Sequence, residues 1–309
     1  MPEPIRVTVL IPVYQGARTL GACLAAVRAQ DYPADRIEVL VVNDGSTDGS
    51  EAIARSVAGV QIVSLPHLGR PGALNRGLAR AGGDVVLFTD ADCEPPPDWA
   101  STLVGILRDD PRLAGVGGNM LPRVMTAVET AKVLPYLHEF ARDRVLEGTY
   151  AGSCLNGNNM AIRREALLEV GGFGEGYLHG ADADLTRRLL ARGYRLLRTR
   201  RSLVTHLKRE SLVDHLRTRF TRGSTIRFAM EEGIVWRRQL FRAFLRVKAE
   251  FLIDFARLRG LAVLERPVPP RSRVLAPWIN LLGGWANWAG QVHYYRRFRP
   301  ELQRLGPKR

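Results

Sequence analysis

Two groups of carboxylates in the first half of the sequence suit binding of a metal ion and a charged ligand. The segment Thr89-Asp90-Ala91-Asp92 holds two aspartates two residues apart, directly after an apolar run. Two carboxylates at the end of a strand can share one hard divalent cation with the phosphates of a ligand. A lone Asp-x-Asp is often only a solvated loop, so its position in the fold must decide between these interpretations.

A third carboxylate follows a second apolar run. Asp44 lies in Asn43-Asp44-Gly45-Ser46, a sequence typical of a tight turn. Gly45 permits the turn conformation, and Ser46 or Thr47 can cap the next helix, so turn and cap chemistry explains most of this segment. It does not explain Asp44, which we expect to act as a hydrogen-bond acceptor beside the aspartate pair.

The elements around these residues predict a parallel sheet. Over the first hundred residues, strands predicted at Val7–Ile11, Ile37–Val42 and Val85–Thr89 alternate with helices at Leu20–Ala29 and Gly72–Ala81. Such alternation predicts a sheet covered by helices, in which ligands bind beyond the carboxyl ends of the strands. The polar clusters all follow those ends.

The middle of the chain has a different pattern. From about residue 116 the sequence predicts Gly-rich turns, followed by a helical piece at 127–147. Further helices are predicted at 163–170, 182–192 and 211–230, the last of them basic.

Five segments in this order resemble the successive motifs of family 2 glycosyltransferases. They are LIPVYQG, VVNDGSTDGS, TDADC, GNNMAIRREALLEVGGF and GADADLTRRLLARGYRL, and they span roughly residues 5–205. The resemblance implies a GT-A (Rossmann-like) α/β fold with a mixed, mainly parallel sheet flanked by helices. It also implies a nucleotide-diphospho-sugar donor, a divalent metal (Mn²⁺ or Mg²⁺) and inversion at the anomeric carbon.

The resemblance assigns the donor side of the site. Pro12 and Tyr14 match positions that line the nucleobase pocket, with Tyr14 stacking on the base, and Asp44 matches the carboxylate that accepts a base N–H. Asp92 matches the residue in direct contact with the metal, and Asp90 the one facing the ribose or the metal. The metal would act as a Lewis acid on the diphosphate leaving group.

Two further donor-side segments leave alternatives open. Asn158 and Asn159 match the segment near the transferred sugar, although the same amides could satisfy a buried turn. Many relatives have Arg at the position of Leu74. Here Arg70 or Arg76 could supply the missing positive charge to the phosphates, and Arg76 could equally be a solvated helix residue.

The acceptor side rests on a variant motif. Family members usually show Glu-Asp-x-Asp-Leu where this chain has Ala181 first, and the second residue is the usual general base, which implies Asp182. Asp184 could instead be the base, or carry negative charge in the first turn of a helix, where it is favoured. His206 follows a strand-like segment where several GT-A enzymes place an extra metal or phosphate ligand, and a structural histidine is the alternative.

Positive charge is concentrated in the last third of the chain. Residues 201–309 carry 23 of the 45 Lys and Arg but only 8 of the 31 Asp and Glu. We therefore expect a catalytic domain at residues 1–230 and a basic, aromatic-rich, amphipathic helical extension at 231–309. Phenylalanines and leucines recur there at helical spacing among arginines, and tryptophans follow, a pattern that suits an anionic membrane surface. Packing on the catalytic domain is the alternative, and no nucleic-acid module accompanies the charge, so no nucleic-acid partner is expected.

Other features indicate the compartment. The three cysteines have no CxxC spacing, which argues against a disulfide framework or a zinc site. The N-terminus does not resemble a signal peptide. The longest uncharged stretch of the tail, Val274 to Gln291, is interrupted by Pro277 and Gly283-Gly284 and falls short of a transmembrane helix. We expect a cytoplasmic protein, peripheral on the inner face of the cell membrane.

The leading hypothesis is an inverting, metal-dependent glycosyltransferase that builds a polysaccharide or glycolipid, using a glycan or lipid-linked acceptor. A nucleotidyltransferase is one alternative, but it would ordinarily show a Gly-rich, basic loop after the first strand. A nucleotide-sugar-binding protein without turnover is the other, with Ala181 and Leu74 as signs of lost activity.

Overall fold

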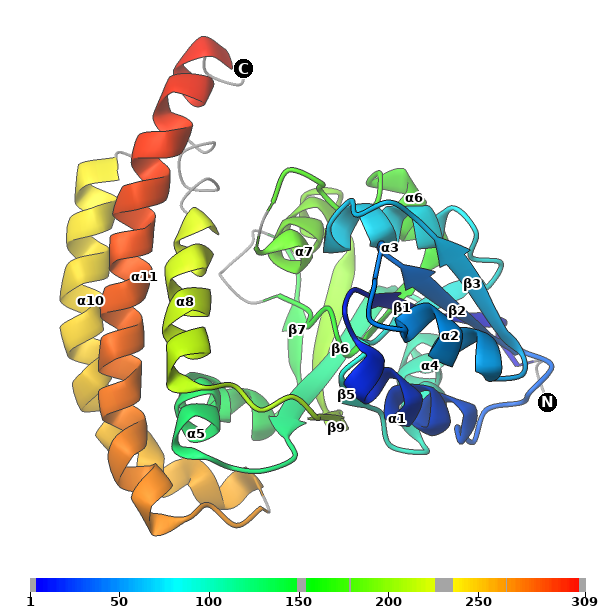
Figure 1. Ribbon diagram of the computed structural model, residues 1–309, viewed down its shortest axis with the longest axis horizontal. Helices are drawn as coiled ribbons and strands as arrows, with labels where there is room; N and C mark the ends of the chain where they lie inside the picture. Colours follow the sequence, from blue (N-terminus) through cyan, green and yellow to red (C-terminus); the bar gives the residue numbers. More distant parts are fainter. Residues whose placement is uncertain (1–3, 149–153, 178, 226–235, 265, 306–309) are drawn as a thin grey trace. The chain divides into compact units, whose positions relative to one another are not determined.

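The chain folds into two compact units (Figure 1). The computed structural model describes residues 4–148, 154–177, 179–225, 236–264 and 266–305. One unit, here called the sheet unit, comprises Met1–Arg123, Glu139–Glu175 and Ala181–Lys208. The other, the helical unit, comprises Val124–His138, Gly176–Gly180 and Arg209–Arg309. The expected boundary between residues 230 and 231 lies outside the described residues.

The strands of the sheet unit form one mixed sheet, as the sequence predicted. In the described residues its order is β3-β2-β1-β4-β8-β6-β9-β5, with β7 paired to β9. The first four strands in this order are parallel, and β8 then runs antiparallel between β4 and β6. The strands are β1 (Val7–Val13), β2 (Ile37–Asn43), β3 (Val60–Ser64), β4 (Val85–Phe88), β5 (Cys93–Glu94), β6 (Leu113–Pro122), β7 (Arg144–Leu146), β8 (Met160–Arg163) and β9 (Arg195–His206).

Helices cover the sheet through apolar faces. They are α1 (Ala17–Arg28), α2 (Ser50–Ser56), α3 (Arg70–Leu78), α4 (Trp99–Asp109), α6 (Arg164–Glu169) and α7 (Ala181–Ala191). In α1 the buried residues Leu20, Cys23, Leu24 and Val27 recur at helical spacing, so one stripe of the helix faces the core. They join the apolar side chains of β1 and β4 and the buried Trp99 in one cluster. This packing fixes the carboxyl ends of β1, β2 and β4 at one edge.

Two predictions for the middle of the chain were wrong. The segment predicted as Gly-rich turns is the ten-residue strand β6, because its glycines allow close approach of neighbouring elements. A Cβ at Gly118 would lie 2.3 Å from the Ser202 carbonyl oxygen. The helical piece predicted at 127–147 is α5 (Ala127–Val133), the 3-10 helix η1 (Leu134–Phe140) and strand β7. Pro135 lacks the N–H that a continuing α-helix needs, which accounts for the break.

In the helical unit, three long helices lie side by side (Figure 1): α8 (Leu212–Arg222), α10 (Trp236–Arg257) and α11 (Pro270–Leu305). The uncharged stretch of the tail is not broken at Pro277 or at Gly283-Gly284, since α11 runs through all three residues. Glycines here serve contact between helices: a Cβ at Gly290 would lie 1.9 Å from the Phe220 carbonyl oxygen of α8. The proline-rich break predicted at 266–272 is shorter than expected, because the 3-10 helix η3 ends at Leu264 and α11 already begins at Pro270.

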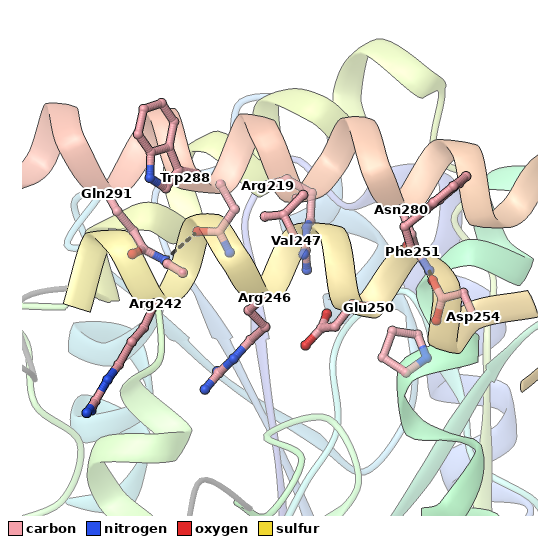
Figure 2. Close-up of a pocket in the computed structure, with 14 residues that line it drawn as sticks. Arg219, Arg242, Arg246, Val247, Glu250, Phe251, Asp254, Asn280, Trp288 and Gln291 are labelled. Carbon is pink, nitrogen blue, oxygen red and sulfur yellow. Dashed lines mark hydrogen bonds between the residues drawn. The ribbon is translucent and has the colours of Figure 1, made fainter. Parts of the chain in front are cut away.

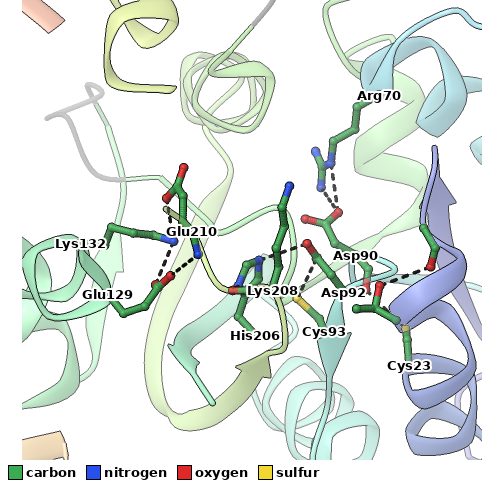
Figure 3. Close-up of polar contacts among 12 residues, drawn as sticks. Cys23, Arg70, Asp90, Asp92, Cys93, Glu129, Lys132, His206, Lys208 and Glu210 are labelled. Atoms are coloured by element: carbon green, nitrogen blue, oxygen red, sulfur yellow. Dashed lines mark hydrogen bonds and ion pairs between the residues drawn. The ribbon is translucent and has the colours of Figure 1, made fainter. Parts of the chain in front are cut away.

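A buried ionic network joins α5 to the segment before α8. The Lys132 ammonium lies 3.0 Å from Glu129 and 3.1 Å from Glu210, as Figure 3 shows. Burial raises the pKa of Glu210, but its hydrogen bond with His215 and its contact with Lys132 outweigh burial and lower the pKa to about 2. Charge pairing therefore helps hold the helical unit together.

None of the described helices combines the length and the apolar composition that crossing a bilayer requires.

Candidate active site

The loops that follow β1 and β2 are tied to each other. The Gln15 backbone N–H donates to Ser46 Oγ at 3.1 Å, and its side-chain amide donates to Thr47 Oγ1 at 3.0 Å. The Gly16 N–H donates to Ser50 Oγ at 2.9 Å. These bonds fix the rim of the sheet where Tyr14 emerges, even though Gln15 has a positive φ of 52°.

Tyr14, Asp44 and His67 form a small cluster at this rim. The Asp44 carboxylate is only 2% exposed and accepts the backbone N–H groups of Leu68 (2.7 Å) and Gly69 (3.0 Å). His67 Nδ1 lies 2.9 Å from Asp44 Oδ2. The His67 ring stacks on Tyr14 with a centroid distance of 4.1 Å and an interplanar angle of 26°. Tyr14 and Asp44, both predicted for the nucleobase pocket, are thus linked through His67. Pro12, the third residue predicted there, lies half-buried in β1 opposite Val42.

This cluster has the groups that recognise a planar heterocycle: an aromatic face and an adjacent carboxylate acceptor. His67 was not predicted from the sequence. Its imidazole stacks on Tyr14 and contacts the Asp44 carboxylate, and a bound heterocycle would make the same two contacts. The only sequence signal of His67 was its place in the loop between β3 and α3, because a lone histidine carries no motif.

Arg70 binds the first aspartate of the pair (Figure 3). Its Nε and Nη2 donate to Asp90 Oδ1 at 3.1 and 2.8 Å, and Nη2 also donates to the Gly157 carbonyl at 2.9 Å. Burial raises the pKa of Asp90, and the positive charge of Arg70 lowers it. The negative charge of Asp92 also raises it, and the pKa of Asp90 lies above its ordinary value. Arg70 therefore places a positive charge beside the aspartate pair.

The two arginine alternatives are distinguished by position. Leu74 is fully buried in the core, and Arg76 is exposed on α3. Arg70 begins the helix directly after Gly69, whose φ is 82°. The guanidinium that contacts the aspartates thus comes from one helical turn before the position of the family arginine.

The second aspartate faces His206. Strand β5 pairs antiparallel with β9, with Cys93 opposite His206, and the Leu207 N–H donates to the Asp92 carbonyl at 2.8 Å. This register places His206 Nε2 3.2 Å from Asp92 Oδ2, as Figure 3 shows. His206 Nδ1 lies 3.1 Å from the Lys208 carbonyl oxygen.

The chemistry of this pair fits a divalent cation. A carbonyl can only accept, so the contact with Lys208 places a proton on His206 Nδ1, and Nε2 faces a carboxylate oxygen of Asp92. An imidazole nitrogen and a carboxylate oxygen are both ligands that a divalent cation can take when the cation replaces the proton between them. Burial raises the pKa of Asp92, but the hydrogen bond with His206 outweighs it and the pKa lies below its ordinary value.

Within the described ranges, no cluster of three or more His, Cys, Asp or Glu side chains could enclose a metal. Mg²⁺ is commonly held by one or two carboxylates together with the phosphates of a ligand, and such a site needs no cluster of this kind. Asp92 and His206 would hold it, with Asp90 beside them.

The two acidic residues of α7 have different surroundings. Asp184 is 2% exposed, and its two oxygens accept from Arg187 (3.0 Å) and Arg188 (2.7 Å). Asp182 is half-buried and accepts the Ala183 N–H at 2.9 Å, in the first turn of the helix. Burial lowers the pKa of Arg70, but the negative charges of Asp90 and Asp182 outweigh it and raise that pKa. The negative charge of Asp182 thus acts on Arg70, while both oxygens of Asp184 accept from arginines of its own helix.

Asn159 was predicted either to lie near the transferred sugar or to hydrogen-bond within a buried turn, and the structure favours the second role. Its side chain is fully buried, and its oxygen accepts from Trp99 Nε1 (2.9 Å) and Ser202 Oγ (2.8 Å). Its amide nitrogen donates to the Asn119 carbonyl at 2.6 Å. These bonds occupy the amide, whereas Asn158 is half-buried at the turn.

Two buried residues, Arg198 and Cys23, hydrogen-bond to segments of the sheet unit and belong to no motif that the sequence revealed. Arg198 is 5% exposed and donates to Glu139 (2.6 Å), Asn119 (2.8 Å) and the Cys154 carbonyl (2.6 Å). Cys23 Sγ donates to the Asp90 carbonyl at 3.4 Å. Burial raises the pKa of Cys23 well above its ordinary value, so it remains a neutral thiol.

The chain matches the model of a known family over residues 8–171, described as glycosyl transferase family 2. It belongs to that family. This membership confirms the resemblance in the sequence motifs.

The chain spans only part of the length of the curated relatives that it matches. The chain is 31% identical over 202 residues to "Glycosyltransferase AglE" of Haloferax volcanii, covering 62% of this chain and 63% of that protein. It is 30% identical over 208 residues to "Beta-monoglucosyldiacylglycerol synthase" of Synechocystis, covering 61% of this chain and 41% of that protein.

The fold also resembles that of a solved structure. A mannosyltransferase from Pyrobaculum calidifontis, in complex with GDP-Man and Mn²⁺, has a TM-score of 0.56 and 24% sequence identity, and the match covers 98% of this chain and 79% of that one. This likeness confirms the predicted GT-A fold class.

Proposed function

We propose that this protein transfers a sugar from a nucleoside-diphosphate sugar to an acceptor hydroxyl, with inversion and with a divalent cation. One observation carries the proposal. The Tyr14–Asp44 pair, the Arg70–Asp90 pair and the Asp92–His206 pair lie in one unit, at the carboxyl ends of neighbouring strands. A base acceptor, a fixed cation and a metal-ligand pair are the features that a nucleoside diphosphate requires.

The donor residues have distinct tasks. Tyr14 offers its half-exposed face for stacking on the base, and Asp44 accepts a base N–H after His67 moves aside. Arg70 brings positive charge to the phosphates. A bound divalent cation at Asp92 and His206 would supply Lewis-acid stabilisation of the leaving diphosphate.

Asp182 is the proposed general base. It takes the proton of the acceptor hydroxyl as that oxygen attacks the anomeric carbon, and the direct displacement inverts the centre without a covalent intermediate. The salt bridges of Asp184 with Arg187 and Arg188 support this choice, because both oxygens of that carboxylate already accept from arginines of the same helix.

A lipid-linked or glycan acceptor at the cytoplasmic face of a membrane is the proposed setting. The relative named "Beta-monoglucosyldiacylglycerol synthase" supports a lipid acceptor. In the helical unit, exposed apolar residues gather on α10 and α11 beside arginines, which suits a peripheral position on anionic lipid. They include Phe241, Leu245, Leu252, Leu275, Trp278 and Leu282.

Transfer and hydrolysis of a panel of nucleotide sugars, with Mn²⁺ or Mg²⁺, test the chemistry. We expect Asp92→Ala to weaken donor binding. We expect Asp182→Asn to keep donor binding and to lower transfer about 100-fold or more, the usual contribution of a general base. Asp109→Asn, an exposed change at the end of α4, is the matched control. Unchanged transfer by the Asp182→Asn protein would remove the assigned base, and donor binding without any transfer by the parent would favour the binding-protein alternative.

Vesicle flotation with anionic lipid tests the membrane position. Leu252→Ser on α10 should weaken flotation of the full chain, whereas Leu168→Ser on α6, an exposed leucine of the sheet unit, should not. Equal flotation of the Leu252→Ser protein and the parent would refute attachment through this face.

A further inference from the structure

A cavity in the helical unit is lined by arginines. Its volume is about 290 Å³, and residues of α8, α10 and α11 line it (Figure 2). Arg219 comes from α8, and Arg242 and Arg246 extend from the same side of α10. No task in the proposed sugar transfer uses this cavity.

The positive charge of this cavity exceeds its negative charge. Two carboxylates also line it, Glu250 and Asp254. Asp254 is 1% exposed and already paired: it lies 2.9 Å from Arg257 and accepts from Asn280 at 2.6 Å. Glu250 is therefore the one remaining carboxylate that faces the three arginines.

Arg219 is poorly compensated. Within the part of the chain that the structure describes, its guanidinium makes one hydrogen bond, a long one of 3.4 Å from Nε to the Gly283 carbonyl. Burial and the nearby Arg222 lower its pKa below the ordinary value. An anion in the cavity would supply the missing hydrogen-bond acceptors and the missing charge.

The two arginines of α10 are one helical turn apart, and neither forms an ion pair with another described residue. Like charges at this spacing repel each other. Three guanidiniums opposed by one carboxylate favour a ligand with about two negative charges. A phosphate monoester has that charge near neutral pH, and its oxygens match the forked donors of arginine.

The surface of α10 indicates where that phosphate comes from. Phe241, Leu245 and Leu252 lie on one stripe of the helix and are 62%, 49% and 71% exposed. The stripe adjoins the face that carries Arg242 and Arg246. An apolar chain on the stripe would leave its head group beside the arginines.

We propose that this cavity binds the phosphate monoester head group of a lipid through Arg219, Arg242 and Arg246. The proposal concerns the helical unit and does not depend on the proposed sugar transfer. It extends the membrane surface suggested above from general attraction to a defined head-group site.

Calorimetric titration of the full chain with dihexanoyl phosphatidic acid, below its micelle concentration, tests the site. Loss of one charged hydrogen-bond partner should weaken binding about tenfold or more, and we expect this for Arg246→Gln. Arg219→Lys keeps the charge but loses the forked donors, so we expect a smaller loss. Arg246 is exposed, so we expect its replacement to leave the fold intact. Arg271→Gln removes an equally exposed arginine of α11 outside the cavity and should leave binding unchanged.

Two further arms identify the source of the phosphate. Inorganic phosphate should bind at least tenfold more weakly than the short-chain lipid, and flotation should favour phosphatidic acid over phosphatidylglycerol at matched surface charge. Equal binding of inorganic phosphate would overturn the lipid assignment. Equal losses for Arg246→Gln and Arg271→Gln, or no preference for the monoester, would overturn the site. Donor binding, measured on the same variants, should not change, so failure here is distinct from failure of the proposed transferase chemistry.

Discussion

His67 holds the place that the base of the donor is proposed to take. Its ring lies 4.1 Å from that of Tyr14, and its Nδ1 lies 2.9 Å from the carboxylate of Asp44. We therefore predict that His67→Ala strengthens nucleotide binding, because the base no longer has to displace the imidazole. Asp44 keeps its two backbone N–H donors in this variant, so the acceptor stays in position.

The size of the gain follows from the two contacts. An aromatic stack is worth about 0.5–1.5 kcal/mol. A hydrogen-bonded pair with a half-exposed imidazole adds about 0.5 kcal/mol after solvent screening. A total of about 1–2 kcal/mol corresponds to binding that is roughly 5- to 30-fold tighter. His67→Phe keeps the stack and loses the N–H, so its gain should be smaller.

Calorimetric titration with UDP and GDP in the presence of Mn²⁺ measures this effect. His138→Ala, at an exposed histidine, is the matched control and should bind as the parent does. If His67→Ala bound nucleotide more weakly than the parent, or equally well, His67 would not be standing in for the base and the reasoning would be refuted.

Three further predictions concern stability. Gly290→Ala should lower the free energy of unfolding by about 1–3 kcal/mol in a denaturant titration, because its Cβ would meet the Phe220 carbonyl oxygen at 1.9 Å. The control Ala289→Ser, at the neighbouring exposed position, should change that free energy little. Arg198→Met should cost about 3–5 kcal/mol in that titration, since it leaves Glu139 buried without its partner, and a loss below 1 kcal/mol would contradict this. Glu210 has its pKa lowered from 4.5 to about 2, so its contribution, about 2–3 kcal/mol, is present above pH 4.5 and lost as the pH falls toward 2. The stability difference between parent and Glu210→Gln should therefore shrink over that range, and a constant difference would refute the assignment.

The sequence alone located the site residues that come directly after a predicted strand. Tyr14, Asp44 and the Asp90–Asp92 pair could be located because apolar strands end immediately before them, and a parallel sheet brings such ends to one edge. The basic, aromatic-rich composition of residues 231–309 was equally readable, because composition and charge are properties of the chain itself.

Only the tertiary structure decided which candidates meet. The pairing of β5 with β9 brings His206 to Asp92 from over a hundred residues away, and the start of α3 at Gly69 directs Arg70 to Asp90. Burial removed Asn159 from the donor candidates, since its amide is filled by neighbours from three other segments. Register, burial and contact are properties of the assembled sheet, and local sequence preferences do not encode them.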